Sequence, residues 1–189
     1  MESEHKIWLI GGSAGSIKAC ISILKAITKP MDRTLIMILH RGNDYKSELA
    51  EIFSNATGHT VMDIGHQTKL EKGVYIAPQD YHLLLDETFN TCLELSEKVN
   101  YSRPSIDVTF ESFSYILKDS LNVAILSGSN ADGAFGVSKV LQRGGRAIVI
   151  HPEDAEFKTM PSETIKQNEG KCSVLKINEL IQCIKKENT

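Results

Sequence analysis

The chain has 189 residues, of which 41% are hydrophobic and 24% charged, and its formal net charge is -3. This length and composition fit a globular protein with a sizeable core, and we expect a single domain over residues 1–189. The small excess of acidic residues argues against nucleic-acid binding, which requires an excess of positive charge.

The four cysteines are widely spaced and form no C-x-x-C pair, which argues against a zinc site and indicates free thiols. Residues 1–6 are polar, so no secretory signal is predicted. The apolar runs are far shorter than the roughly 18 residues of a membrane span. We therefore expect a cytoplasmic protein that does not insert into a membrane.

Short apolar runs alternate with amphipathic stretches over most of the chain. The runs are residues 7–10, 35–39, 123–126, 147–150 and 172–175, and the helix-like stretches are residues 17–27, 45–54, 108–117, 136–141 and 177–184. Fully apolar strands that alternate with helices are typical of βαβ units, in which helices cover both faces of a parallel sheet. The pattern therefore predicts the α/β class.

The middle of the chain does not follow this alternation of apolar and amphipathic segments. Residues 74–77, 81–85 and 92–95 are short strand-like runs joined by turn residues. We expect them to form a small antiparallel insertion over about residues 74–95. After this insertion, Ser105 is a candidate N-cap for the next helix.

The first apolar run ends in Gly11-Gly12-Ser13-Ala14-Gly15, a G-x-S-x-G pattern between a strand and a helix. Ligands of open α/β sheets bind beyond the carboxyl ends of the strands, and this pattern is typical of a nucleophile elbow. The following helix would direct its free N–H groups at an oxyanion formed beside Ser13. A plain connection or a phosphate cradle also fits such a turn, so a nucleotide-binding domain stays open as an alternative.

Two histidines follow apolar runs and compete for the role of general base. His40 ends the second run, and His151 follows residues 147–150. The order Ser13, Asp132, His151 would match the α/β-hydrolases, but several strands precede the nucleophile in those enzymes and only one precedes Ser13. If the first two strands are neighbours, His40 lies near Ser13 and can accept its proton. We therefore favour His40.

Asp132 lies in a loop of small residues after the run at 123–126. A carboxylate there can orient His40 and stabilise the imidazolium that forms during attack. Aspartate is also a favoured helix N-cap, and spacing alone predicts that capping role first. The two roles are compatible.

Several blocks of the chain together resemble one family. In chain order they are Leu9 to Gly15, Leu39-His40, Gly73 to Pro78, Tyr81 to Leu84, Arg103 to Val108, Leu126 to Gly128, Ala131 to Ala134 and Met160-Pro161. They resemble the catalytic domain of the chemotaxis protein-glutamate methylesterase, CheB, and keep that family's order from about residue 7 to about residue 165.

The resemblance implies a doubly wound, mostly parallel α/β fold with helices on both faces. It implies a triad in which Ser13 is the nucleophile, His40 the general base and Asp132 the orienting carboxylate. The implied reaction is hydrolysis of glutamate γ-methyl esters on methyl-accepting chemotaxis receptors, with deamidation of receptor glutamines as a second activity. No metal or organic cofactor is expected. Our candidate oxyanion donors are the backbone groups at Ala14 and Ser129.

Three departures from the family pattern lie close to the triad. Ser129-Asn130 stands where methionine-glycine is usual, and Arg41-Gly42 stands where methionine-proline is usual. Ala14-Gly15-Ser16 replaces threonine and two glycines. These changes keep the triad and alter the wall of the pocket, so we expect them to affect substrate preference and rate.

The family's familiar architecture also has an N-terminal receiver domain, whereas here only a few residues precede the first strand. We therefore expect activity that is constitutive or controlled by a separate partner, such as a receiver protein or a methyltransferase. The missing receiver and the altered pocket residues motivate an alternative hypothesis, a non-catalytic receptor-binding or scaffold domain of the same fold.

Overall fold

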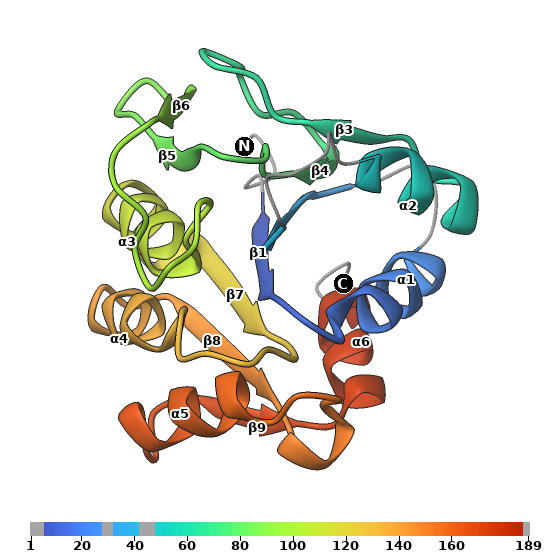
Figure 1. The fold of residues 1–189 in the computed structure, drawn as a ribbon, viewed down its shortest axis with the longest axis vertical. Helices are drawn as coiled ribbons and strands as arrows, with labels where there is room; N and C mark the ends of the chain where they lie inside the picture. The colour runs from blue at the N-terminus through green and yellow to red at the C-terminus, as the bar shows by residue number, and fades with distance from the viewer. Residues whose placement is uncertain (1–5, 28–31, 42–47, 187–189) are drawn as a thin grey trace.

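The computed structural model describes residues 6–27, 32–41 and 48–186. Within these residues, one parallel sheet has the strand order β3-β4-β2-β1-β7-β8-β9 (Figure 1). Its strands are β1 (Ile7–Gly12), β2 (Thr34–Leu39), β3 (Val61–Asp63), β4 (Gly73–Ile76), β7 (Leu121–Ile125), β8 (Arg146–Ile150) and β9 (Ser173–Leu175).

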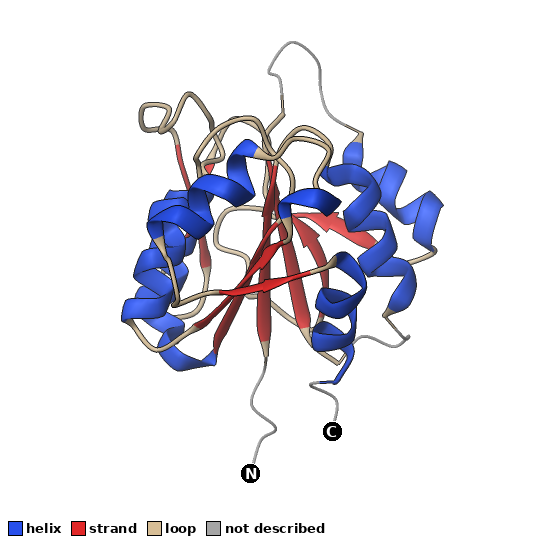
Figure 2. Cartoon of the chain, turned by 90° about the horizontal axis from the view of Figure 1, so that it is seen from below, coloured by secondary structure: helices blue, strands red, loops and turns tan. Residues whose placement is uncertain are grey.

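Helices cover both faces of this sheet, as the views in Figures 1 and 2 show. One face packs against α3 (Ile106–Leu117), α4 (Ala134–Gln142) and α5 (Thr159–Gln167), and the other against α1 (Ser16–Ala26), α2 (Leu49–Thr57) and α6 (Ile177–Lys186). Two short 3-10 helices, η1 (Lys118–Ser120) and η2 (Pro152–Asp154), complete the helical elements of the described residues. The predicted α/β fold with a doubly wound parallel sheet is confirmed.

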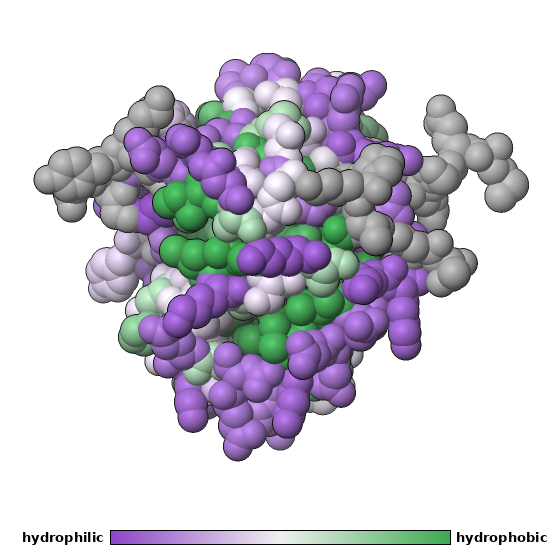
Figure 3. Space-filling view, turned by 90° about the vertical axis from the view of Figure 1, so that its right-hand side faces the viewer, coloured by the Kyte–Doolittle hydropathy of each residue, from purple (hydrophilic) through white to green (hydrophobic). Residues whose placement is uncertain are grey.

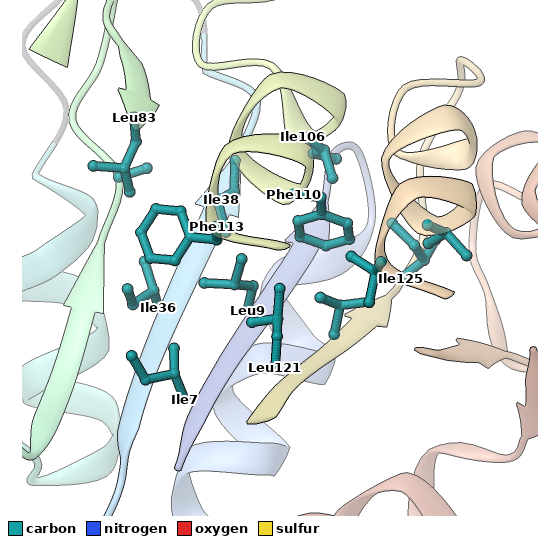
Figure 4. Packing of buried hydrophobic residues seen from close by; sticks show 14 of the residues in the cluster. Ile7, Leu9, Ile36, Ile38, Leu83, Ile106, Phe110, Phe113, Leu121 and Ile125 are labelled. Atoms are coloured by element: carbon teal, nitrogen blue, oxygen red, sulfur yellow. The ribbon is translucent and has the colours of Figure 1, made fainter. Parts of the chain in front are cut away.

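The central strand β1 shows why the sheet needs helices on both sides. All six of its residues are buried, and alternate side chains point to opposite faces. Leu9 belongs to the core beneath α3, where it lies near Phe110 and Phe113 (Figure 4), whereas Trp8 and Ile10 belong to the core beneath α1, α2 and α6. A fully apolar strand is therefore stable only between two helical layers.

The chain reverses its direction of growth at β1. After β1 it adds β2, β3 and β4 on one side, with β4 between β2 and β3, and it then returns to add β7, β8 and β9 on the other side. The loops that follow β1 and β7 consequently leave the sheet next to each other. In open α/β sheets, such a switch point forms the crevice that binds ligands.

The antiparallel part is narrower than the predicted insertion. β5 (His82–Leu85) and β6 (Thr91–Glu94) pair as an antiparallel hairpin, but β4 is a parallel strand of the main sheet, between β2 and β3. Residues 45–47 of the predicted helix at 45–54 lie outside the described residues, and α2 begins at Leu49. The predicted N-cap Ser105 is confirmed, since its side chain accepts from the Val108 N–H.

The outer face of α1, α2 and α6 is mixed in polarity. Figure 3 shows bands of apolar surface separated by polar side chains on this side of the molecule. Ile17 of α1 and Ile52 of α2 are among its exposed apolar residues. Among the helices of the described residues, none has the length and apolar character needed to cross a bilayer.

Packing beneath α3 provides a test of the fold. Phe113 is fully buried, whereas Phe89, which follows β5, is 52% exposed. We expect Phe113→Ala to lower the free energy of unfolding by about 3–5 kcal/mol, because it leaves a cavity in a close-packed core. Phe89→Ala is the matched control and should change it by less than about 1 kcal/mol. Urea unfolding measures both values, and equal losses would contradict the packing described.

Candidate active site

The carboxyl ends of β1 and β2 bring Ser13 and His40 side by side. The parallel register pairs Gly12 with Leu39, and the His40 N–H donates to the Gly12 carbonyl at 3.2 Å. Ser13 and His40 line one pocket, and its other described lining residues are Ala14, Gly15, Ile17, Leu39, Arg41 and Leu49. A hydroxyl and an imidazole thus share one small, partly apolar crevice at the switch point.

The turn after β1 is fixed by hydrogen bonds to the loop after β7. The Ser13 N–H and the Ser16 hydroxyl both donate to the Ser127 carbonyl, at 2.8 and 2.7 Å. A Cβ on Gly12 would lie 2.3 Å from Ser16 Oγ, and Gly15 has a φ of +79°. Both positions therefore require glycine. The turn leaves the Ser13 side chain half-buried at the pocket.

The two candidate oxyanion residues differ in their placement. Ala14 lines the pocket next to Ser13, and no hydrogen bond between described residues uses its N–H. α1 begins two residues later, so its positive N-terminal end faces the same place. Ser129 is exposed in the loop after β7 and is not among the described residues that line this pocket. The geometry thus favours Ala14 over Ser129 as a donor.

Asp132 joins the site from the loop after β7. It is fully buried, and its Oδ2 accepts from His40 Nε2 at 2.7 Å. Its remaining hydrogen bonds from described residues are to the Ile106 N–H (2.7 Å), the Ser105 hydroxyl (2.8 Å), the Asp107 N–H (3.1 Å) and the Asn100 amide (3.1 Å). Two of these donors are the first N–H groups of α3, so Asp132 caps α3 while it holds His40.

These contacts fix the ionisation of Asp132 and the tautomer of His40. Burial alone would raise the pKa of Asp132, but the hydrogen bond and charge of His40, with the Ile106 N–H, bring the pKa below its usual value. Asp132 is therefore a carboxylate at neutral pH. A carboxylate only accepts hydrogen bonds, so Nε2 of the neutral His40 ring carries the hydrogen and Nδ1 carries the lone pair.

Asp107 is the counterpart of Asp132. Its Oδ1 accepts from the N–H groups of Gly133 and Gly136, at 2.9 and 2.7 Å, at the start of α4. We expected Asp132 to cap its own following helix; instead Asp132 caps α3, and Asp107, which lies in α3, caps α4. The Asn100 amide donates to both carboxylates. Burial first, and the charge of Asp132 second, raise the pKa of Asp107 to about 6.

The second ring nitrogen of His40 is occupied as well. His40 Nδ1 lies 3.1 Å from Ser102 Oγ, whereas the hydrogen bonds of the described residues include none between Ser13 Oγ and His40. Ser102 belongs to a tight turn in which Val99 and Ser102 exchange two backbone hydrogen bonds, at 3.2 and 2.9 Å. The imidazole is thus held from both sides, by Asp132 and by Ser102.

His151, the other candidate for the general base, lies after β8. It caps η2 through a hydrogen bond from the Glu153 N–H and is 41% exposed. The Asp132 carboxylate contacts His40 and makes no hydrogen bond to His151 within the described residues. The arrangement of carboxylate and imidazole therefore favours His40.

Arg41, one of the residues that depart from the family pattern, has clear contacts in the structure. The Arg41 guanidinium is buried, donates to the Ala77 carbonyl and lies 4.0 Å from Asp63. Burial lowers the pKa of Arg41, and the charge of Asp63 opposes this effect. Arg41 thus covers the ends of β3 and β4, while Gly42 lies outside the described residues.

Asn130 has a local role in the loop that carries Asp132. Its side-chain oxygen accepts from the Asp132 N–H at 3.2 Å, and its amide lies 3.4 Å from the Asn100 carbonyl. The residue therefore links the loop after β7 to the turn at 99–102.

Two residues of this constellation, Asn100 and Ser102, were not predicted from the sequence. The available signal was a polar run between Val99 and Pro104 immediately before the Ser105 cap. It marks a turn but does not reveal which atoms the turn contacts. No group of three or more His, Cys, Asp or Glu side chains suited to a metal ion occurs in the described part of the chain.

Comparisons with known proteins identify the family of this chain. Residues 8–184 match the family model described as CheB methylesterase. A Leptospira interrogans protein named "Putative protein-glutamate methylesterase/protein-glutamine glutaminase" is 34% identical over 163 residues, which cover 86% of this chain and 84% of that protein. The crystal structure of the Thermotoga maritima CheB methylesterase catalytic domain matches with a TM-score of 0.88 and 28% identity, over 96% of this chain and 98% of that domain.

The fold is a doubly wound α/β domain whose crevice, which holds a serine hydroxyl and a carboxylate-bound imidazole, lies at the β1 switch point. The chain belongs to the CheB methylesterase family. It spans about half of a longer relative, the Thermotoga maritima protein-glutamate methylesterase/protein-glutamine glutaminase, of which 48% is covered at 29% identity.

The exchanged caps predict a specific pH dependence of stability. The pKa of Asp107 is raised to about 6 in the folded chain, against roughly 3.9 when unfolded. The folded state thus holds this proton more tightly, and the stability this provides is complete below about pH 4 and is lost as the pH rises through about 6. Asp107→Asn cannot ionise, so wild type should lose stability relative to this variant over that range.

Urea unfolding at stepped pH values measures this difference. Asp119→Asn changes an exposed carboxyl in η1 and is the matched control. Parallel pH profiles for wild type and Asp107→Asn would contradict the assignment.

Proposed function

We propose that this chain is a cytoplasmic serine hydrolase that removes γ-methyl groups from glutamate side chains of chemotaxis receptors. The observation that carries the proposal is the 2.7 Å hydrogen bond between His40 and the buried Asp132, in a pocket that Ser13 shares. Membership of the CheB methylesterase family supports the same reaction. The names of the relatives support both ester hydrolysis and deamidation of glutamine.

The proposed chemistry follows from the ring nitrogens of His40. Asp132 holds Nε2, so Nδ1 is the nitrogen that accepts the hydrogen of the Ser13 hydroxyl as Oγ attacks the ester carbonyl. His40 then donates this proton to the departing methoxide oxygen as its bond to the carbonyl carbon breaks, so that methanol leaves and an acyl-enzyme remains on Ser13. Water, activated by the same nitrogen, releases the glutamate. Asp132 stabilises the imidazolium in both steps.

The negative oxygen of the tetrahedral intermediate needs hydrogen-bond donors. The Ala14 N–H is the first candidate because Ala14 lines the pocket beside Ser13 and the N-terminal end of α1 lies behind it. The Ser129 backbone is the second candidate and would have to approach the pocket when substrate binds. A glutamine amide would follow the same path as the ester, with ammonia as the leaving group.

One observation favours a second candidate function, a non-catalytic receptor-binding or scaffold domain. Ser13 Oγ has no hydrogen bond to His40 within the described residues, and Ser102 occupies the nitrogen it needs. In this alternative the pocket would bind a receptor segment, a receiver protein or a methyltransferase without cleavage. A fluorophosphonate probe separates the two functions, because only an activated serine is labelled covalently.

The nucleophile is tested directly by Ser13→Ala. We expect this variant to lower methanol release from methyl-labelled receptor by at least about 10³-fold, because no acyl-enzyme can form. Ser22→Ala, which removes a hydroxyl whose one hydrogen bond within the described residues is to the Lys18 carbonyl of α1, is the matched control and should keep normal turnover. Normal turnover in Ser13→Ala would contradict the proposed nucleophile.

The histidine and the carboxylate are tested as a pair. We expect Asp132→Asn to reduce turnover by about 10⁴-fold, because the amide favours the wrong tautomer of His40. His40→Ala should abolish methanol release, and His151→Ala should leave it near wild type. Thermal unfolding checks that each variant is folded, since Asp132 also caps α3. Activity that survives in His40→Ala and disappears in His151→Ala would overturn the assignment.

A further inference from the structure

The turn at residues 99–102 places a second hydroxyl on the proposed base. Ser102 Oγ lies 3.1 Å from His40 Nδ1, and the opposite nitrogen, Nε2, is held by Asp132 at 2.7 Å. Because Nε2 carries the hydrogen, the neutral ring offers one lone pair, on Nδ1. The Ser102 hydroxyl is therefore the donor in this contact, and it occupies the only acceptor site of the ring.

Ser13 needs the same lone pair. Ser13 and His40 share a pocket, but the hydrogen bonds of the described residues join His40 to Ser102 and not to Ser13. A single lone pair on a ring nitrogen accepts one strong hydrogen bond at a time. The two serine hydroxyls consequently exclude each other from Nδ1.

We propose that Ser102 is a positioning residue that competes with Ser13 for His40 Nδ1 and keeps the base capped in the substrate-free protein. The proposal rests on the proposed function, in which Ser13 is the nucleophile and His40 the base. It deepens that function because it assigns a resting state in which the imidazole is correctly oriented but its lone pair is occupied.

The surroundings of Ser102 allow its hydroxyl either to stay on His40 Nδ1 or to turn away from it. A second acceptor, the Asn100 carbonyl, lies 3.4 Å from Ser102 Oγ. Rotation of the hydroxyl from Nδ1 to this carbonyl frees the lone pair without a change in the backbone. Release of the base therefore needs the exchange of one hydrogen bond for another.

The same turn connects the cap to the molecular surface. Asn100 and Tyr101 have φ values of 49° and 62°, a conformation that non-glycine residues rarely adopt. The Tyr101 side chain is 97% exposed at the tip, while the Asn100 amide below it holds Asp107 and Asp132. The strained turn is thus anchored at its inner residue and open to solvent at its outer residue, next to the hydroxyl that must move.

Labelling with a fluorophosphonate probe tests the competition without a receptor substrate. A net hydrogen bond has the free energy of a roughly 3- to 10-fold equilibrium. We therefore expect Ser102→Ala to be labelled at Ser13 about 3 to 10 times faster than wild type. Ser102→Thr keeps the hydroxyl and should be labelled at close to the wild-type rate. Ser96→Ala, at an exposed serine of the same segment, is the matched control.

The labelling outcomes separate this inference from the proposed function. If Ser13 is labelled at the same rate in wild type and Ser102→Ala, or more slowly in Ser102→Ala, the competition is wrong while the nucleophile stands. If Ser102 itself is labelled in Ser13→Ala, Ser102 is a nucleophile and the inference is overturned. If neither wild type nor Ser102→Ala reacts, the proposed nucleophile and the inference both fail.

A spectroscopic measurement tests the cap independently of reactivity. In the Ser13→Ala protein, the ¹⁵N chemical shift of His40 Nδ1 reports the hydrogen bond from Ser102. We expect this signal to move when Ser102→Ala is added and to stay in place when Ser102→Thr is added. An unchanged signal in both double variants would overturn the proposal, and the dispersion of the amide spectrum shows whether each variant is folded.

Discussion

The Asp132 carboxylate is the group on which both the fold and the site depend. It has no solvent exposure, yet it remains ionised because every oxygen accepts hydrogen bonds from described neighbours, including two N–H groups at the start of α3 and Nε2 of His40. A buried charge without such partners would be strongly destabilising. The carboxylate therefore fixes where α3 begins relative to the strand that carries His40.

The exchange of caps between α3 and α4 ties the start of one helix to the start of the other. Asp132, which precedes α4, caps α3, and Asp107, which lies in the first turn of α3, caps α4. The loop before α4 thus supplies the anion for α3, α3 supplies the anion for α4, and the Asn100 amide donates to both carboxylates. The repulsion between two nearby acids is tolerated because N–H dipoles surround both of them. The carboxylate that orients His40 is consequently also part of the contact between two helices.

The features that could be predicted from the sequence are those with a local signal. The glycine-flanked Ser13 and the strand-terminal His40 are recognisable because strand, turn and helix follow one another within a few residues. The α/β class follows from the alternation of apolar runs and amphipathic stretches. The single-domain organisation and the roles of the triad residues stay predictions.

The remaining features depend on contacts between distant segments. The run at residues 73–76 is too short to distinguish a parallel strand of the main sheet from part of an antiparallel insertion. In the structure Val74, Tyr75 and Ile76 are all buried, as expected for a strand covered on both faces. The capping of α3 by Asp132 joins residues 26 positions apart, and the contact of Ser102 with His40 joins residues 62 positions apart. No local preference encodes either contact, so the sequence alone could suggest a helix cap but not which helix it serves.

The shared use of Asp132 has a consequence for how the protein moves. Fraying of the first turn of α3 would withdraw the Ile106 and Asp107 amides from the carboxylate and, at the same moment, loosen the partner of His40. Local opening of a helix end and loss of an ordered imidazole are then one cooperative event, a single foldon in the language of hydrogen exchange. Exchange of the Ile106 and Asp107 amides should therefore report the fraction of molecules in which the site is disassembled.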